Sequence, residues 1–382
     1  MHENGERNDM MKNDLALRIS REDSQRISIL KLLMVIMVVF IHSYKTNINY
    51  AEEVVAYDVP LWFEIMKYGI SEVLCRSAVP CFAFLSAYLL YRKPFTWKEN
   101  ITKKTKSILI PYFVLNAFWV VVYFICQHIP AVSSFFSNPE TIVANWGLHG
   151  WISAFFGTPS DHTPMLAILW FLRDLFVVNL LAPAFDWIVR TLKYWALALF
   201  VLVWLFLRST NIFCLNVQVL CFWGIGCCLA RQRIALSSLD KYRPVISVTY
   251  LVLVILKILL RNQDGIWPLF VTRLCFLTGI AFWFVWATRI RGEKLHSRLL
   301  SLSRYGFCVY LFHEMTLSFL RKVFTRLLPQ TLPFAMILYF GIPVVIILYC
   351  FALSYLLDRY VPRLYEIVSG GRRTNFFTAS QP

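Results

Sequence analysis

Long apolar segments alternate with short polar ones along almost the whole chain. Ten segments are long enough to cross about 30 Å of hydrocarbon, at residues 28–46, 68–91, 107–127, 167–189, 193–209, 212–231, 244–261, 267–288, 304–326 and 335–358. The 382 residues are 58% hydrophobic, against about 45–50% in a typical soluble domain. The pattern therefore predicts an all-α integral membrane protein, a bundle of about ten transmembrane helices.

The basic residues are distributed unevenly between the polar segments. With the N-terminus in the cytoplasm, the inner segments hold 27 of the 38 Lys and Arg residues, and the outer loops and their flanks hold seven. This asymmetry follows the positive-inside rule and predicts that both termini are cytoplasmic. The rule also explains the formal charge of +16, so no nucleic-acid partner is expected.

The two ends of the chain are polar. Residues 1–27 are mixed in charge, and no A-x-A cleavage site follows the first apolar segment, so they are expected to be a cytoplasmic tail rather than a signal peptide. The transmembrane domain then covers 28–360, and 361–382 forms a second cytoplasmic tail. The ten cysteines lie in or beside apolar segments without a CxxC pair, which predicts buried thiols rather than disulfides or a zinc site.

The longest outer loop, 128–166, is rich in aromatic residues. Such a segment is expected either to lie on the membrane interface or to fold over the mouth of the bundle as a substrate lid. Its His149, Asp161 and His162 carry metal-ligating atoms, but their spacing matches no standard site. No metal is therefore predicted.

The first apolar segment carries a lysine at its entrance and a histidine near its exit. Lys31 and His42 are eleven residues apart, which places them within about 20° of one helical face and roughly 16 Å apart along the axis. A histidine inside a lipid-spanning helix is costly unless it faces a polar cavity, so His42 is a functional candidate. The alternatives are an inert His42 near the outer interface and a Lys31 that only obeys the positive-inside rule.

Two further spans carry arginine. Arg76 precedes Pro80 by four residues, and the proline is expected to remove a backbone hydrogen bond and kink the helix beside the charge. Arg173 and Asp174 are neighbours that point about 100° apart. Asp174 is therefore expected to find a cation in Arg76 or in the surroundings of Arg173.

His313 and Glu314 form an ionisable pair near the middle of the ninth span, about 14 Å from its cytoplasmic end. With His42 and the arginines, they suit a general base beside a cationic clamp for an anionic ligand. They suit a transporter with a proton relay equally well. No P-loop, dinucleotide fingerprint, H-E-x-x-H or G-x-S-x-G motif occurs, so phosphoryl transfer, redox chemistry and serine hydrolysis lose support.

Five motifs in order resemble the membrane-bound acyltransferase family 3. The first motif, in the first helix, is a basic residue followed after ten intervening positions by a histidine. The other four are RSAVPCFAFLSAYLL, ILIPYF, LWFLRDL and YGFCVYLFHE. The resemblance covers residues 24–360. Within the family, the chain is similar to the branch that includes the enterobacterial common antigen O-acetyltransferase and exopolysaccharide acetylases. His42 matches the family's essential histidine and Lys31 its basic partner. Arg76 matches the arginine ahead of the V-P element, and His313 the histidine of the Y-L-x-H element.

The resemblance implies a multi-pass protein of the bacterial inner membrane that moves an acyl group, expected to be acetyl, from cytoplasmic acetyl-CoA to a glycan hydroxyl. The acceptor is a surface glycan or its lipid-linked precursor. His42 is expected to be the general base or a transient acyl carrier, with help from His313. Arg76 or Arg173 is expected to stabilise the oxyanion.

Substrate binding is expected to involve further charged side chains. Lys31, with Arg92 and Lys93 nearby, is expected to attract the CoA phosphates. Arg173, Asp174 and Glu314 are the other candidate substrate-binding residues. No bound cofactor is expected, and a transporter or flippase for a glycan or small anion is the alternative function.

Overall fold

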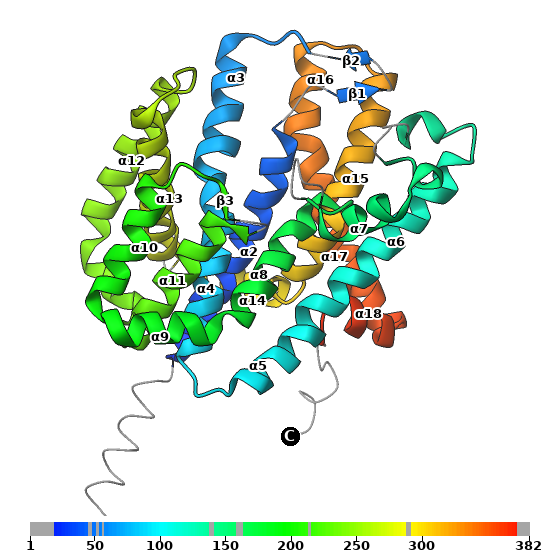
Figure 1. The fold of residues 1–382 in the computed structure, drawn as a ribbon. Coiled ribbons are helices and arrows are strands. Elements are labelled where there is room, and N and C mark those ends of the chain that lie inside the picture. Colours follow the sequence, from blue (N-terminus) through cyan, green and yellow to red (C-terminus); the bar gives the residue numbers. More distant parts are fainter. Residues whose placement is uncertain are drawn as a thin grey trace, which may run out of the picture. The chain divides into compact units, whose positions relative to one another are not determined.

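The computed structural model describes residues 19–44, 48–50, 53–55, 57–136, 141–157, 163–212, 215–287 and 292–372 (Figure 1). This part of the chain is helical apart from its connections and two short antiparallel hairpins. The hairpins pair β1 (Ile48–Tyr50) with β2 (Glu53–Val55) and β3 (Asn211–Ile212) with β4 (Leu215–Asn216). The prediction of an all-α membrane protein is confirmed.

The α-helices follow one another with short connections. They are α2 (Arg21–Ser43), α3 (Leu61–Lys67), α4 (Ala78–Tyr91), α5 (Trp97–Lys104), α6 (Ile110–Gln127), α7 (Leu148–Phe156), α8 (Trp170–Leu180), α9 (Ala182–Leu192), α10 (Tyr194–Phe206), α11 (Val217–Arg231), α12 (Arg243–Leu259), α13 (Ile266–Ala287), α14 (Glu293–Ser303), α15 (Gly306–Leu327), α16 (Leu332–Met336), α17 (Ile342–Tyr360) and α18 (Pro362–Val368). π-Helical segments at Tyr68–Leu74, Thr105–Leu109 and Ile337–Gly341 join several of them into longer stretches.

Six helical stretches in the described part of the chain are long and apolar enough to cross a membrane. They are Arg21–Ser43, Leu61–Tyr91, Trp97–Gln127, Leu236–Leu259, Ile266–Ala287 and Leu332–Tyr360. A seventh results if Ala167–Leu180 and Ala182–Leu192, which bend by 59°, form one broken span. Helices α10 and α11 are apolar but shorter, and α15 carries several charges. The count of ten spans and the cytoplasmic placement of the termini stay predictions.

Helix boundaries differ from those predicted, because hydropathy detects only the apolar part of a helix. Helix α2 starts at Arg21, inside the segment predicted to be a tail, and ends at Ser43. Its first turn carries Glu22 and Asp23, whose negative charge favours a helix N-terminus. Helix α5 occupies part of the segment predicted to be an inner loop, and α18 lies within the predicted C-terminal tail.

The chain divides into two compact units, each assembled from three separate segments. Unit 1 comprises Met1–Met34, Ser77–Ile101 and Val177–Ser303, and unit 2 comprises Val35–Arg76, Thr102–Phe176 and Arg304–Pro382. In unit 1, α4 packs closely on α11, where a Cβ at Gly226 would overlap the backbone oxygen of Phe84. Small residues allow this close approach of helices in membranes.

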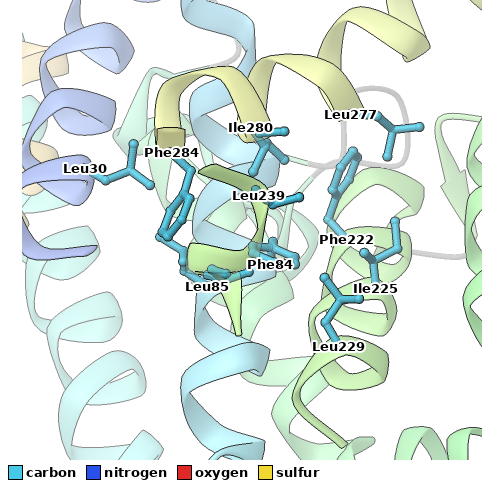
Figure 2. A pocket seen from close by; sticks show the side chains of 12 residues that line it. Leu30, Phe84, Leu85, Phe222, Ile225, Leu229, Leu239, Leu277, Ile280 and Phe284 are labelled. Carbon is cyan, nitrogen blue, oxygen red and sulfur yellow. The ribbon is translucent and has the colours of Figure 1, made fainter. Parts of the chain in front are cut away.

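Unit 1 also holds a buried arginine and an apolar pocket. Arg26 donates to both carboxylate oxygens of Asp240 at 2.6 and 3.0 Å and to the backbone oxygen of Phe284 at 2.9 Å, which fixes the start of α2 in the unit. The pocket, of about 120 Å³, is shown in Figure 2. All twelve of its lining residues are apolar, so it offers no acid or base.

In unit 2, α15 packs against α17, and α6 packs against α18. The C-terminal part of α2 is held by Ser71 of the π-helical segment, whose hydroxyl donates to the backbone oxygen of Phe40 at 2.7 Å. The Ser71 oxygen also lies 2.9 Å from the hydroxyl oxygen of Tyr339. These contacts fix the turn of α2 that carries His42.

Candidate active site

The two histidines singled out in the sequence lie side by side in unit 2. His42 is in the last turn of α2, and His313 is near the middle of α15. Their ring centroids are 5.2 Å apart, and the ring planes are inclined by 63°. His313 is fully buried, whereas His42 is partly exposed. Residues 271 positions apart in the chain thus form an imidazole pair.

The hydrogen bonds of His313 define the tautomer of its neutral ring. Its Nδ1 lies 3.0 Å from the backbone oxygen of Val309 and 2.8 Å from that of Tyr310. Both oxygens are acceptors only, so Nδ1 carries the proton and Nε2 of the neutral ring has a free lone pair. Nε2 is buried and has no hydrogen-bond partner among the described residues. His313 therefore keeps a basic atom in the interior of the unit.

Arg321, two turns beyond His313 on α15, also contacts α2. Its Nη1 donates to the backbone oxygen of His42 at 3.0 Å. This oxygen lies in the last turn of α2, where helix carbonyls lack intrahelical partners and cations are favoured. The side chain is buried, with 8% of the residue exposed, and its Nε has no partner among the residues described.

Arg76 is held by an acidic neighbour that the sequence analysis did not single out. Its Nε and Nη2 donate to the two carboxylate oxygens of Glu72 at 2.9 and 2.6 Å. Arg76 lies in a 3₁₀ turn, Cys75–Ser77, which follows the π-helical segment that contains Glu72. The irregularity predicted from Pro80 thus takes the form of a change in helix type, and Pro80 itself lies in the first turn of α4.

Arg173 and Asp174 pair with each other, so the neighbouring residue supplies a cation for the Asp174 carboxylate. Nε and Nη2 of Arg173 lie 3.1 and 3.0 Å from the same Asp174 oxygen. The third nitrogen, Nη1, donates to the backbone oxygen of Phe156 at 2.6 Å. Neighbours on a helix diverge at Cβ, but the long arginine side chain folds back far enough to reach the carboxylate.

The bond from Arg173 to the backbone oxygen of Phe156 is one of three hydrogen bonds that hold the end of α7. Asn116 of α6 donates to the backbone oxygen of Ala154 at 2.7 Å, and Tyr112 donates to that of Phe155. Arg173 supplies the third donor, to Phe156. The last carbonyls of α7 are thereby satisfied. In this structure Arg173 helps to hold α7 in place, and its predicted role in binding substrate stays a prediction.

Glu314 and Lys31 have different surroundings. A carboxylate oxygen of Glu314 accepts from the backbone N–H of Ile168 at 3.3 Å, and Tyr310 donates to the backbone oxygen of the same residue. Glu314 therefore lies beside the start of α8 and directly follows His313 on α15. Lys31 is partly exposed in unit 1 on the same uninterrupted helix as His42. The binding roles of both remain predictions.

Metal-binding clusters and disulfides are absent from the part of the chain that the structure describes. No group of three His, Cys, Asp or Glu side chains there is arranged to hold a metal ion. His149 is exposed on α7, while Asp161 and His162 lie outside the described residues. Nine cysteines are free thiols, most of them buried, as predicted, and Cys214 lies outside the described residues.

Two charged residues beside the candidate site, Arg321 and Glu72, were not predicted from the sequence, each for a physical reason. Arg321 was counted with the basic residues of the outer flank, because topology alone accounts for a cation at a helix end. Its place two turns from His313 was the signal that it belongs with the ninth span. Glu72 lies four residues before Arg76, a spacing at which opposite charges pair on a helix.

Comparison with known proteins adds an independent line of evidence. The chain matches the family model described as an acyltransferase domain over residues 25–359. It is 27% identical over 372 residues to the "Succinoglycan biosynthesis protein ExoH" of Rhizobium meliloti (strain 1021), covering 94% of this chain and 95% of that protein. No solved structure matches. Because the family match spans most of its length, the chain belongs to the acyltransferase 3 family and is a membrane O-acyltransferase.

Proposed function

We propose that this enzyme transfers an acyl group, most simply acetyl, from cytoplasmic acyl-CoA to a hydroxyl of a surface polysaccharide or its lipid-linked precursor. The observation that carries the proposal is the imidazole pair of His42 and His313, with ring centroids 5.2 Å apart. The reaction needs a base that a hydroxyl can reach, and His42 is the more exposed member of the pair. The enzyme is assigned to the bacterial inner membrane.

The chemistry assigned to His42 is general-base catalysis. Its ring takes the proton from the acceptor hydroxyl while the hydroxyl oxygen attacks the thioester carbonyl carbon. The tetrahedral intermediate then collapses, the carbon–sulfur bond breaks, and the departing CoA thiolate takes the proton from His42. An acyl-histidine, formed first and then attacked by the hydroxyl, is the alternative route. His313 supports His42 through its unprotonated Nε2.

The donor side of the proposal rests on cations at the predicted cytoplasmic ends of α2 and α4. Lys31 lies in the first half of α2, and Arg92 follows α4. Arg92 is buried, and its Nε and Nη1 have no hydrogen-bond partners among the described residues. Guanidinium N–H groups without partners suit phosphate oxygens. These cations are therefore proposed to receive the CoA phosphates.

The acceptor side rests on the relative. ExoH is described as a succinoglycan biosynthesis protein, and it aligns with nearly the whole of this chain. A polysaccharide provides many hydroxyl groups and no strong leaving group of its own, which fits an enzyme that brings the activated acyl group from a thioester. The acceptor is therefore proposed to be a polysaccharide or its biosynthetic precursor.

The test is the loss and return of an acyl substituent on the surface polysaccharide. A deletion strain is expected to produce polysaccharide lighter by that substituent in mass spectrometry, and the plasmid-borne gene is expected to restore it. Membranes from the restored strain are expected to transfer label from radioactive acetyl-CoA to polysaccharide. Unchanged polysaccharide together with altered solute uptake would contradict the proposal and favour a transporter.

A further inference from the structure

We propose that Arg321 is the oxyanion-binding residue of this acyltransferase. Its guanidinium stabilises the negative charge that develops on the thioester carbonyl oxygen when the acceptor attacks beside His42. The inference rests on the proposed function and assigns to Arg321 the role that the sequence had offered to Arg76 or Arg173. Three observations in unit 2 support the assignment: burial without a counter-ion, the pairing of the competing arginines, and attachment to the catalytic histidine.

Arg321 is a buried cation without a carboxylate partner. Only 8% of the residue is exposed, and no Asp or Glu side chain among the described residues forms an ion pair with it. Its buried Nε has no hydrogen-bond partner in the same part of the chain. A buried charge is costly unless an anion compensates it. An anion that forms during the reaction provides that compensation.

The two arginines that the sequence offered for this role, Arg76 and Arg173, are already neutralised. Arg173 uses Nε and Nη2 for Asp174 and Nη1 for the carbonyl of Phe156, so all three of its nitrogens are bonded. Arg76 directs Nε and Nη2 to Glu72. A guanidinium that already pairs with a carboxylate attracts a further anion less strongly, because the two charges largely cancel. Of these three arginines, Arg321 is the one whose positive charge no Asp or Glu side chain among the described residues compensates.

The bond from Nη1 to the backbone oxygen of His42, 3.0 Å long, fixes the guanidinium beside the proposed base. This bond uses one nitrogen of the guanidinium group, and Nε has no hydrogen-bond partner among the described residues. The ring of the same His42 contacts His313. One residue therefore ties the cation to the base. Donors fixed in advance stabilise a developing charge without reorganising during the reaction, which is the basis of oxyanion catalysis.

In the assigned step, the acceptor oxygen forms a bond to the thioester carbon, and the π electrons of the carbonyl move to its oxygen. Arg321 donates an N–H to that oxyanion. When the carbonyl re-forms, the carbon–sulfur bond breaks and the thiolate leaves with the proton held by His42. Arg321 neither gains nor loses a proton during these reaction steps, as expected for a guanidinium.

The test compares two substitutions of Arg321 in the full-length enzyme, reconstituted in liposomes with acetyl-CoA and polysaccharide acceptor. Arg321→Gln keeps an N–H donor and removes the charge. Its kcat is expected to fall about 100-fold or more, with KM for acetyl-CoA within about threefold of wild type because the ground state is bound as before. Arg321→Lys keeps the positive charge but lacks the planar set of guanidinium N–H donors, and its kcat is expected to lie between those of wild type and Arg321→Gln.

Arg326→Gln is the matched control, since it removes a positive charge from an exposed position of the same helix. Activities are compared per folded molecule, measured on the monodisperse fraction. A kcat of Arg321→Gln within about threefold of wild type would overturn the inference, as would a kcat of Arg321→Lys no higher than that of Arg321→Gln. If Arg321→Gln does not fold, wild-type kcat in Arg321→Lys overturns it, and a kcat reduced about tenfold at unchanged KM supports it. A wild-type enzyme that transfers no label contradicts the proposed function itself.

Discussion

Four ionisable side chains of unit 2 form two groups, one paired with a carboxylate and one with a nitrogen that lacks a partner among the described residues. Arg76 and Arg173 are each held by a carboxylate. Arg321 and His313 are buried, and each keeps one nitrogen without a hydrogen-bond partner among the described residues. Both contact His42. These two buried nitrogens place one hydrogen-bond donor and one acceptor without partners in the described part of the chain beside His42, where a bound substrate would satisfy them.

The orientation of His313 leads to a prediction at the residue scale. Asparagine places an amide N–H near the position of Nδ1, so His313→Asn keeps donors for the carbonyls of Val309 and Tyr310 but has no atom at Nε2. We expect its melting temperature to stay near that of wild type and its kcat to fall about 100-fold, the range of lost acid–base assistance. His313→Gln, with an oxygen near Nε2, is expected to retain more activity.

Thermal melts and initial rates of acetyl transfer check this prediction. His128→Asn is the matched control, because His128 is an exposed histidine directly after the last residue of α6. Wild-type kcat in a folded His313→Asn variant would show that Nε2 has no part in the reaction.

At the level of secondary-structure elements, hydropathy predicted the apolar helices, of which six or seven in the described part of the chain are long enough to cross a membrane. The predicted first helix carries both Lys31 and His42, as α2 does. Hydropathy does not report hydrogen-bond register. The π-helical segment Tyr68–Leu74 and the 3₁₀ turn that carries Arg76 were therefore not predicted beyond a kink at Pro80. Nor does a helical pattern reveal that Arg321 of α15 reaches the backbone of α2, because that contact joins residues 279 positions apart.

Packing of α4 on α11 allows a prediction at this scale. Gly226→Ala adds a Cβ that would overlap the backbone oxygen of Phe84, and a backbone atom cannot turn aside as a side chain can. We expect a loss of about 1–3 kcal/mol in stability, the usual cost of overpacking, seen as a lower melting temperature in detergent. Gly341→Ala, whose Cβ would make an ordinary contact with Ile337, is the control. Equal melting temperatures for the two variants would show that α4 and α11 do not pack this closely.

At the scale of the whole molecule, the division into two units has no counterpart in the sequence pattern. Each unit draws on three segments, so no linker or change of composition marks a boundary. Six of the seven candidate site residues belong to unit 2, and Lys31 belongs to unit 1. The sequence motifs thus identified most of the ionisable groups of the site, while their pairing required the tertiary structure.

The positive-inside distribution of Lys and Arg makes a prediction about topology. A green fluorescent protein fused after residue 382 is expected to fluoresce, because the C-terminus is predicted to be cytoplasmic. Alkaline phosphatase placed at residue 263, between α12 and α13, is expected to be active, because that connection is predicted to lie outside. Inactive phosphatase at 263 together with active phosphatase at the C-terminus would reverse the orientation.

The most direct test of the proposed catalytic role of His42 is the acyl-transfer rate of a His42 variant. Membranes that contain equal amounts of wild type, His42→Ala or the exposed-histidine control His128→Ala are supplied with radiolabelled acetyl-CoA and polysaccharide acceptor. If His42 is the general base or acyl carrier, His42→Ala lowers the initial rate of transfer about 100-fold or more, and His128→Ala transfers at the wild-type rate. Transfer by His42→Ala at the wild-type rate would contradict this role.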